Sequence, residues 1–288
     1  MLAAMQAAMR PGFFDAADGL KLYSEGYPSE VPARAVVVFL HGYADHCGRY
    51  GEAARFLAGH GFPVLAIDCR GHGQAAGARG HCEAFGDFLG DLDRAVTQAR
   101  QTHGELPLVL LAHSHGGLIC LRSLCDPARA PRGVSALVLS APFLGLRARV
   151  NPAKQVLARM TSRVVPRLAM ANEIDPAILS HDPEMVAARR ADRLCHTVAT
   201  ARWYTEATAA QGWVQENVHK LAIPSLWLVP GDDRLVDADT TRRAYARAGG
   251  DKTKIEYDGL FHELLLERER GRVFADIERW LAPRFPAR

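Results

Sequence analysis

Short runs of hydrophobic residues alternate with longer amphipathic stretches along most of the chain. Candidate strands are Val36–Leu40, Val64–Asp68, Leu108–Ala112, Ala136–Ser140, Ser225–Val229 and Lys254–Tyr257. Candidate helices are Gly51–Ala58, Phe85–Arg100, Gly117–Cys125, Thr240–Arg247 and Val273–Leu281. The runs stand next to Gly, Pro or polar residues, and most are followed by a helical stretch. This order is typical of the α/β class, with a mostly parallel sheet covered by helices on both faces.

The strand pattern stops between Ala141 and about Val218 and resumes at Ile223. The intervening segment has the pattern of helical pieces, broken at Pro152, Pro166, Pro176 and Pro183. A chain of 288 residues accommodates one α/β core with such an insertion. We therefore expect a single core made of residues 1–140 and 219–288, with residues 141–218 inserted as a helical cap.

Composition and charge narrow the class of protein. The chain has 35 Lys and Arg against 32 Asp and Glu, a net charge of +3, which is too weak to favour nucleic acid as a partner. Hydrophobic residues make up 48% and charged residues 23%, and no apolar run approaches the roughly 20 residues that a membrane span needs. These values predict a soluble globular enzyme and leave its oligomeric state open.

The cysteines and the first residues bear on cellular location. The six cysteines lack paired C-x-x-C spacing, so neither a zinc ribbon nor a redox dithiol is indicated; they are Cys47, Cys69, Cys82, Cys120, Cys125 and Cys195. We expect them to be reduced and mostly packed. Met1–Arg10 is apolar but short, without the basic start of a signal peptide, and its Ala and Met residues favour a helix. A cytoplasmic location follows as the expectation.

The strongest chemical signal is Ser114, which follows the apolar run Leu108–Ala112 and precedes a predicted helix. A sharp strand-to-helix turn strains the serine and crowds the neighbouring backbones, so the residues two before and two after must be small. Ala112 and Gly116 stand at these places. The segment therefore predicts a nucleophile elbow.

A serine hydroxyl needs a base and a carboxylate that orients the base. His262 lies between the last predicted strand and the last predicted helix, so we expect it to be the general base. Asp232, Asp233 and Asp237 follow the preceding strand, and all fit the chain order Ser, Asp, His. The spacing from the strand end favours Asp233, with Asp232 as its nearest rival, and the unused carboxylates are expected to cap the next helix.

Acyl transfer also needs backbone donors for the developing oxyanion. We expect one to be the N–H of His115, directly after the nucleophile. The second is expected from the loop after Val36–Leu40, where Gly42 loosens the turn and Tyr43 offers its N–H.

Two other patterns suggest cofactors but lack the required context. Gly71–Ala76 satisfies the glycine fingerprint of dinucleotide sites, yet Gly77–Gly80 continues the loop where that fingerprint must open a helix. Several histidines precede or flank the predicted site, but no pair has ligand spacing on a predicted helix; they are His41, His46, His72, His113 and His115. The sequence therefore predicts neither a cofactor nor a metal.

With these residues in place, the chain resembles the monoacylglycerol lipase and lysophospholipase group of α/β-hydrolases. The resemblance spans about Val36 to Leu281 and is carried by His41–Tyr50, Asp68–Gly73, Gly231–Asp237 and Phe261–Glu263. It implies the α/β-hydrolase fold and assigns the family roles to Ser114, Asp233, His262, Tyr43 and His115. The departures are Ala112, where the group usually has Gly, and His115, where methionine is common.

The resemblance implies hydrolysis of a single-chain lipid ester. The cap agrees with this, because Leu146–Ala171 has six basic and no acidic residues and a hydrophobic repeat at helical spacing, formed by Leu157, Met160, Val164 and Leu168. The basic residues are Arg147, Arg149, Lys154, Arg159, Arg163 and Arg167. Such a helix favours transient contact with an anionic membrane surface, although an ordinary cap helix with a solvated basic face has the same pattern.

Three other functions remain open at this stage. A short-chain carboxylesterase or acyltransferase would share every predicted catalytic residue. A proline-releasing aminopeptidase of similar fold would need acidic cap residues to hold the substrate ammonium, whereas Leu146–Ala171 is basic. A binding protein without catalytic activity would have little use for the predicted triad.

Overall fold

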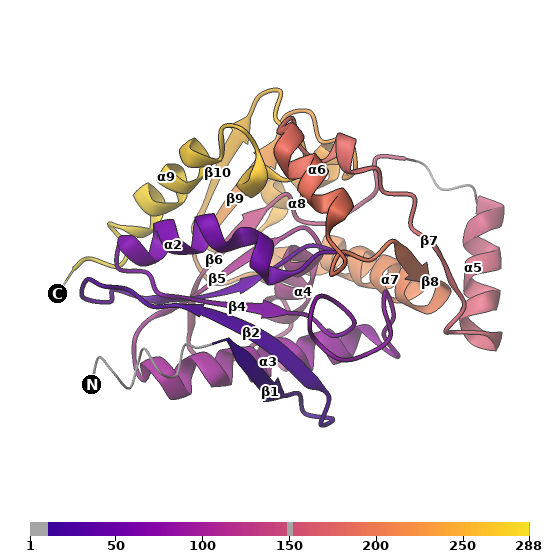
Figure 1. Ribbon diagram of the computed structural model, residues 1–288, viewed down its shortest axis with the longest axis horizontal. Coiled ribbons are helices and arrows are strands. Elements are labelled where there is room, and N and C mark those ends of the chain that lie inside the picture. Colours follow the sequence, from indigo (N-terminus) through magenta and orange to yellow (C-terminus); the bar gives the residue numbers. More distant parts are fainter. Residues whose placement is uncertain (1–10, 149–151, 288) are drawn as a thin grey trace.

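The computed structural model describes residues 11–148 and 152–287 and contains an eight-stranded sheet (Figure 1). In chain order its strands are β1 Gly12–Asp15, β2 Lys21–Tyr27, β3 Val36–Leu40, β4 Val64–Asp68, β5 Leu108–His113, β6 Val134–Ser140, β9 Ser225–Pro230 and β10 Lys252–Tyr257. The spatial order is β1-β2-β4-β3-β5-β6-β9-β10, and the six strands from β4 to β10 run parallel. This confirms the six predicted strands. The antiparallel strands β1 and β2 at one edge were not predicted.

Alternate residues of each central strand pack into two separate hydrophobic cores. In β3, Val36, Val38 and Leu40 join one core, and Val37 and Phe39 join the other. The first core is covered by α3 Phe85–His103, α4 His115–Leu124 and α8 Ala238–Arg247, and the second by α2 Gly51–Gly59 and α9 Arg270–Leu281. Figure 1 shows α2 and α9 on one side of the sheet and α3 on the other. Both faces are buried, which explains why the strands are continuously hydrophobic.

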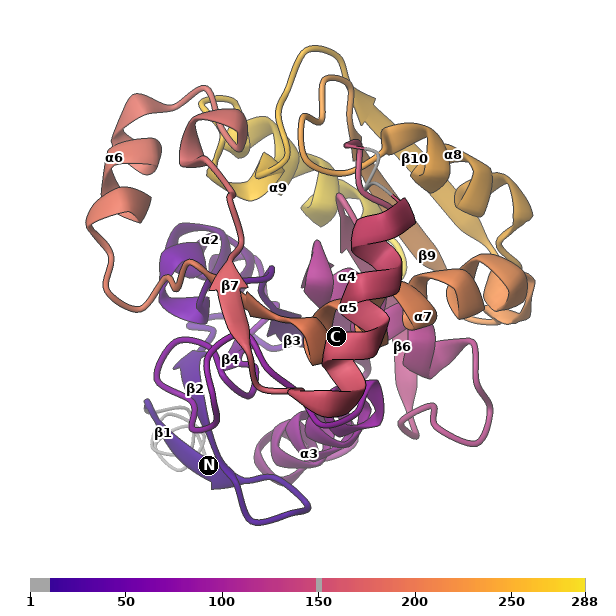
Figure 2. The same ribbon diagram turned by 90° about the vertical axis from the view of Figure 1, so that its right-hand side faces the viewer.

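The segment 141–218 lies beyond the carboxyl ends of the parallel strands, on the side that faces the viewer in Figure 2. It contains α5 Pro152–Val164, β7 Ala169–Ala171, the short 3₁₀ helix η2 Pro176–Ile178, α6 Pro183–Ala191, β8 Val198–Thr200 and α7 Ala201–Asn217. The 3₁₀ helices η1 Cys47–Tyr50, η3 Val218–Lys220 and η4 Leu264–Leu266 belong to the flanking regions.

The structure separates the helical pieces of this segment near the four prolines, as expected, but the expectation of helical pieces alone was wrong. β7 and β8 pair antiparallel, which joins its two halves. Pro152, Pro176 and Pro183 each begin a helix, because the first helical position needs no N–H donor and suits the fixed φ of proline. Pro166 alone lies after a helix end.

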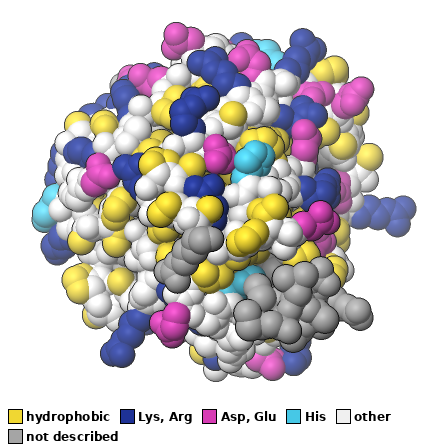
Figure 3. All heavy atoms as spheres, turned by 90° about the vertical axis from the view of Figure 1, so that its left-hand side faces the viewer, with side chains coloured by type: hydrophobic (Ala, Val, Ile, Leu, Met, Phe, Trp, Pro, Cys, Tyr) yellow, Lys and Arg dark blue, Asp and Glu magenta, His cyan; other side chains and the backbone are white. Residues whose placement is uncertain are grey.

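Among the described residues, no helix is both long enough and apolar enough to cross a bilayer. On the face that Figure 3 shows, acidic and basic side chains are interspersed instead of forming a field of one sign. The predicted helix at Met1–Arg10 lies outside the described residues.

Candidate active site

Ser114 sits at the turn between β5 and α4. Its backbone is strained, with φ 50° and ψ −110°, a combination that residues other than glycine rarely adopt. The turn brings backbones close together, because a Cβ placed on Gly116 would lie 2.6 Å from the carbonyl oxygen of Leu40. Ala112, on the other side, is fully buried. The crowding that the sequence argument assumed is therefore present at both positions.

Ser114, His262 and Asp233 form one hydrogen-bonded chain. The Oγ of Ser114 lies 2.9 Å from His262 Nε2, and His262 Nδ1 lies 2.7 Å from Asp233 Oδ2. All three are at most 5% exposed. They come from loops after β5, β10 and β9, which end at the same edge of the sheet.

The structure separates the three candidate aspartates. The second oxygen of Asp233 accepts hydrogen bonds from the N–H groups of Leu235 and Val236, at 2.9 and 2.8 Å. Asp232 points to the exterior, where Arg147 and Arg234 are its partners. Asp237 accepts from the backbone at the start of α8, as expected for a helix cap.

Tyr43 and His115 flank the serine, in the loop after β3 and at the first residue of α4. Among the described residues, 11–148 and 152–287, the backbone N–H groups of Tyr43 and His115 have no hydrogen-bond acceptor. The Tyr43 ring stacks on Trp203 at 3.6 Å, and its hydroxyl donates to the Val198 carbonyl at 2.8 Å. The segment 141–218 therefore holds the Tyr43 loop in place.

The cavity above Ser114 is small. Its volume is about 20 Å³, which is room for about one water molecule. Ile174, Leu179 and Arg189 of the 141–218 segment line it together with the loops that carry Ser114 and His262. This space is too small for an organic substrate.

A buried ionic cluster that the sequence reasoning missed borders this cavity. Arg49 contacts Asp45 at 2.8 Å and Glu263 at 3.1 Å, and Arg189 contacts the same two carboxylates at 3.1 and 2.9 Å. Burial raises the pKa of Asp45, but the charges of the two arginines outweigh burial and hold this pKa well below its usual range. Arg189 lies on α6, so the cluster ties this helix to the residue next to His262. No sequence signal links Arg189 to partners so far away in the chain.

Two buried histidines flank Ser114 without a contact to its hydroxyl. Burial, with a smaller contribution from His41, lowers the pKa of His115 to about 3, and its Nε2 lies 3.4 Å from Trp203 Nε1. Burial and the neighbouring His262 also hold the pKa of His113 well below its ordinary value. Both imidazoles are therefore neutral at physiological pH.

His115→Met is expected to reduce the acid sensitivity of the fold. In the unfolded chain His115 has a pKa of about 6.5, whereas in the folded chain its pKa is about 3. Between these two pH values a proton binds the unfolded chain but not the folded one, so the stability of the wild type falls as the pH drops. The loss from this residue amounts to about 2 kcal/mol between pH 7 and pH 5. Denaturant unfolding at the two pH values measures it.

The quantity to compare between this variant and the wild type is the change in stability between the two pH values. The absolute stabilities also differ, because the substitution removes the hydrogen-bond acceptor of Trp203 Nε1. His60→Gln, at an exposed histidine, is the control and should keep the wild-type difference between pH 7 and pH 5. An equal loss in His115→Met and wild type would contradict the assignment of the acid sensitivity to His115.

The glycine-rich loop after β4 has a structural role. Residues 69–84 are all described and contain no helix, so Gly71–Ala76 does not open one. The carboxylate of Asp68 instead accepts from the N–H groups of Cys47 and Gln74, each at 2.7 Å. A Cβ on Gly73 would lie 2.1 Å from that carboxylate, which explains the glycine.

Known proteins resemble this chain in sequence and in fold. The model of the family described as "Serine aminopeptidase, S33" matches residues 31–269. A monoacylglycerol lipase of Mycolicibacterium smegmatis is 32% identical over 93% of this chain and 95% of its own length. Phospholipase YtpA of Bacillus subtilis is 30% identical over 83% of this chain and 92% of its own. The crystal structure of a Paleococcus ferrophilus monoacylglycerol lipase, 29% identical, superposes with a TM-score of 0.81 and covers 90% of this chain and 98% of that one.

Proposed function

Because the chain belongs to the serine aminopeptidase S33 family of α/β-hydrolases, and within it to the monoacylglycerol lipase group, we propose that it hydrolyses carboxylic esters of single-chain lipids. The observation that carries this proposal is the chain of hydrogen bonds from Ser114 through His262 to Asp233, which borders a small cavity lined in part by the 141–218 segment. Monoacylglycerols and lysophospholipids are the candidate substrates.

In the proposed mechanism His262 Nε2 accepts the hydroxyl proton of Ser114 while Oγ attacks the ester carbonyl. The N–H groups of Tyr43 and His115 stabilise the oxyanion, and protonated His262 then gives its proton to the leaving alcohol. A water molecule, deprotonated by His262, hydrolyses the acyl-enzyme and releases the fatty acid. Asp233 holds the imidazole so that its Nε2 faces the serine. No step needs a metal or cofactor.

We propose residues 141–218 as the cap and the cavity between α5 and α7 as the acyl-chain site. That cavity measures about 220 Å³, and Phe143, Leu146 and Trp203 are among its lining residues. Phe143 is adjacent to the nucleophile, because its N–H donates to the Ser114 carbonyl at 2.9 Å. The aromatic and aliphatic side chains of this cavity, close to Ser114, suit an acyl chain, although Gln155, Thr208 and Gln211 also line it.

An aminopeptidase, the activity that the family's description names, fits less well, and so does the proline-releasing kind considered above. It requires a carboxylate free to pair with the substrate ammonium. The two carboxylates that line the Ser114 cavity, Asp45 and Glu263, are both already paired with Arg49 and Arg189. A short-chain carboxylesterase or acyltransferase keeps all the catalytic contacts and differs only in the substrate it prefers.

A substrate panel tests the proposal. We expect kcat/KM for long-chain 1-monoacylglycerol or lysophosphatidylcholine to exceed that for short p-nitrophenyl esters by at least about tenfold, because each buried methylene adds about 0.8 kcal/mol. A preference for short esters would reduce the proposal to a general esterase. Faster cleavage of a prolyl anilide than of any ester would replace it with the aminopeptidase.

We further propose that α5 and the residues after it touch the membrane surface. Of the nine large hydrophobic side chains exposed in the described ranges, seven lie within Val156–Met170. α5 ends at Val164, so Leu168 of the predicted repeat lies beyond the helix, where it is also exposed. Arg159 and Arg163 are exposed on the same helix. Exposed apolar and basic side chains together favour an anionic lipid surface.

The triple variant in which Leu157, Met160 and Val164 are replaced by Ser is expected to bind anionic liposomes at least tenfold more weakly. Each substitution removes most of the free energy that the hydrophobic side chain gains on insertion into the lipid. Replacing Arg159, Arg163 and Arg167 by Gln should also weaken it, by about 1 kcal/mol per residue at low salt. Hydrolysis of a soluble ester should not change. Co-sedimentation measures the binding.

Phe13→Ser and Val31→Ser are the controls for the liposome experiment, because they remove the other two exposed large hydrophobic side chains of the described ranges. They should bind liposomes as the wild type does. Unchanged binding by both triple variants would remove the membrane proposal and leave the catalytic one intact.

A further inference from the structure

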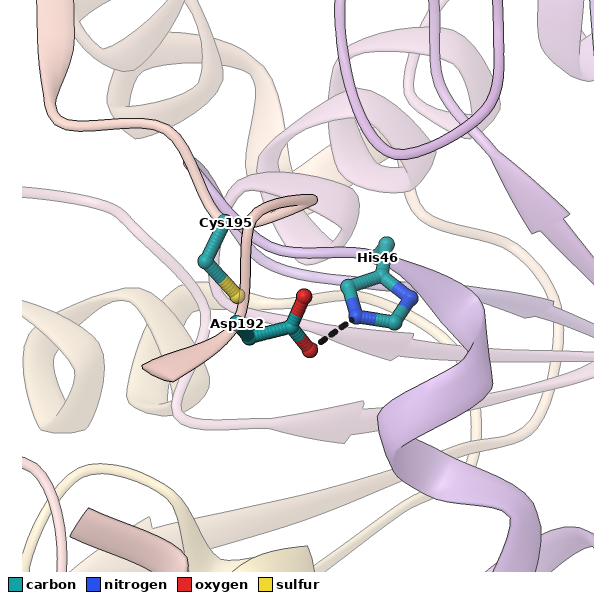
Figure 4. A group of neighbouring side chains, drawn as sticks. All are labelled: His46, Asp192 and Cys195. Carbon is teal, nitrogen blue, oxygen red and sulfur yellow. Dashed lines mark hydrogen bonds and ion pairs between the residues drawn. The ribbon is translucent and has the colours of Figure 1, made fainter. Parts of the chain in front are cut away.

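Three side chains with metal-ligand chemistry meet where the loop after β3 touches the segment 141–218. His46 precedes η1, Asp192 follows α6, and Cys195 lies three residues further on. One ligand atom from each lies within 4.8 Å of the other two, and His46 Nε2 is 2.8 Å from Asp192 Oδ2. Figure 4 shows the imidazole, the carboxylate and the sulfur facing the same space.

We propose that His46, Asp192 and Cys195 bind a divalent cation of the zinc type. Imidazole nitrogen, carboxylate oxygen and thiolate sulfur are all zinc ligands, whereas Mg²⁺ and Ca²⁺ prefer sites made of oxygen alone. A carboxylate and a thiolate together balance the two positive charges of the ion. Binding breaks the S–H bond of Cys195, forms the metal–sulfur bond and releases the proton to solvent.

The dimensions of the group allow an ion to enter with small side-chain movements. Zinc bonds of about 2.0–2.3 Å in a tetrahedron place neighbouring ligand atoms about 3.3–3.6 Å apart. The contact between His46 and Asp192 must lengthen slightly, and the widest separation, at most 4.8 Å, must shorten. The side chains of His46 and Asp192 are 10% and 26% exposed, so the ion has a path from solvent. Three protein ligands leave the fourth position to water.

Neighbouring groups already orient the three ligands. The N–H of Leu194 donates to Asp192 Oδ1 at 2.8 Å and leaves Oδ2 for the ion. The backbone N–H of His46 donates to Asp45 Oδ1 at 2.8 Å, and Cys195 Sγ lies 3.7 Å from the same oxygen. The negative charge of Asp45 is offset by Arg49 and Arg189, which reduces its repulsion of the thiolate.

An ion at this place would join the catalytic loop to the cap. His46 is three residues after Tyr43, and Asp192 and Cys195 directly follow α6, whose Arg189 lines the Ser114 cavity. Because the cavity must enlarge to admit a substrate and this segment lines it, a bound ion that holds the segment in place is expected to slow hydrolysis. That consequence rests on the proposed function, whereas ion binding does not.

The test uses the full chain without a polyhistidine tag, because a tag would bind the ion itself. Calorimetric titration with Zn²⁺ should show one ion per chain, and Co²⁺ in its place should give a thiolate-to-cobalt charge-transfer absorption. Cys195→Ser should lose this absorption and weaken Zn²⁺ binding by more than tenfold. Asp192→Asn is the second variant, should Cys195→Ser not fold.

Two controls separate the site from adventitious binding. Cys125→Ala removes a buried cysteine at the end of α4 and should keep the wild-type affinity. Replacing the exposed His60 and His219 by Gln should also have no effect. Absence of the thiolate absorption in the wild type, or equal Zn²⁺ affinity in the wild type, Cys195→Ser and Asp192→Asn, would overturn the proposed site.

The effect of bound Zn²⁺ on ester hydrolysis is measured in a separate experiment. Saturating Zn²⁺ should lower the rate of ester hydrolysis several-fold in the wild type, a chelator should restore it, and Cys195→Ser should be insensitive. Binding without inhibition would overturn the coupling to the cap but leave the site. An enzyme without ester hydrolysis that still binds one Zn²⁺ through Cys195 would refute the proposed function and not the site.

Discussion

Ser114→Ala is expected to lower kcat for ester hydrolysis by about 10⁶-fold, with a much smaller change in KM. The change removes the hydroxyl oxygen that lies 2.9 Å from His262 Nε2 and is proposed to form the acyl-enzyme. The backbone donors at Tyr43 and His115 would remain, so residual hydrolysis above the uncatalysed rate is expected. Reaction with a fluorophosphonate probe, followed by mass spectrometry, should place the label on Ser114 in the wild type and nowhere in the variant.

The matched control for this variant is Ser123→Ala. Ser123 is a buried serine on the same helix, α4, where its hydroxyl donates to the Arg129 carbonyl at 2.8 Å. Its loss should cost about 1 kcal/mol of unfolding free energy and leave kcat within a few-fold of the wild type. If Ser114→Ala kept wild-type activity, the nucleophile and the whole proposed mechanism would be wrong; a binding protein without catalytic activity would show no labelling at all.

The central sheet was predictable because its strands are buried on both faces. Val36–Leu40 and Val64–Asp68 match the observed β3 and β4 to the residue, since a continuous hydrophobic run has clear ends. The strand Lys21–Tyr27, which lies between the edge strand β1 and β4, was missed because it is partly polar and borders no helix pattern. β7 and β8, three residues each, are too short to give any periodic signal.

The residues of the candidate site were likewise only partly predictable from the sequence. Ser114 and His262 were identifiable because each follows a strand that ends at one edge of the sheet. The choice among three aspartates depended on spacing alone, and only the fold shows which carboxylate faces His262. Arg189 and Cys195 could not be predicted, because their partners Asp45 and His46 lie about 150 residues earlier and are brought near by the packing of the 141–218 segment.

Asp233→Asn is expected to lower kcat by about 10⁴-fold, through the tautomer of His262. The N–H groups of Leu235 and Val236 bind one oxygen of Asp233, so an asparagine would place its carbonyl there and turn its NH₂ toward His262 Nδ1. Nδ1 would then have to accept a hydrogen bond, and the proton would move to Nε2. An Nε2–H cannot take the hydroxyl proton from Ser114.

Asp232→Asn is the control, since Asp232 is the sequence neighbour and the nearest rival for the same role. Its carboxylate contacts Arg147 and Arg234 at the exterior, where ion pairs contribute about 0–1 kcal/mol, so kcat should stay within a few-fold of the wild type. A pre-steady-state burst with a p-nitrophenyl ester measures acylation directly in both variants. Acylation that is slow in Asp232→Asn and fast in Asp233→Asn would reverse the assignment; equally fast acylation in both would mean that the hydrogen bond at Nδ1 does not set the tautomer that catalysis needs.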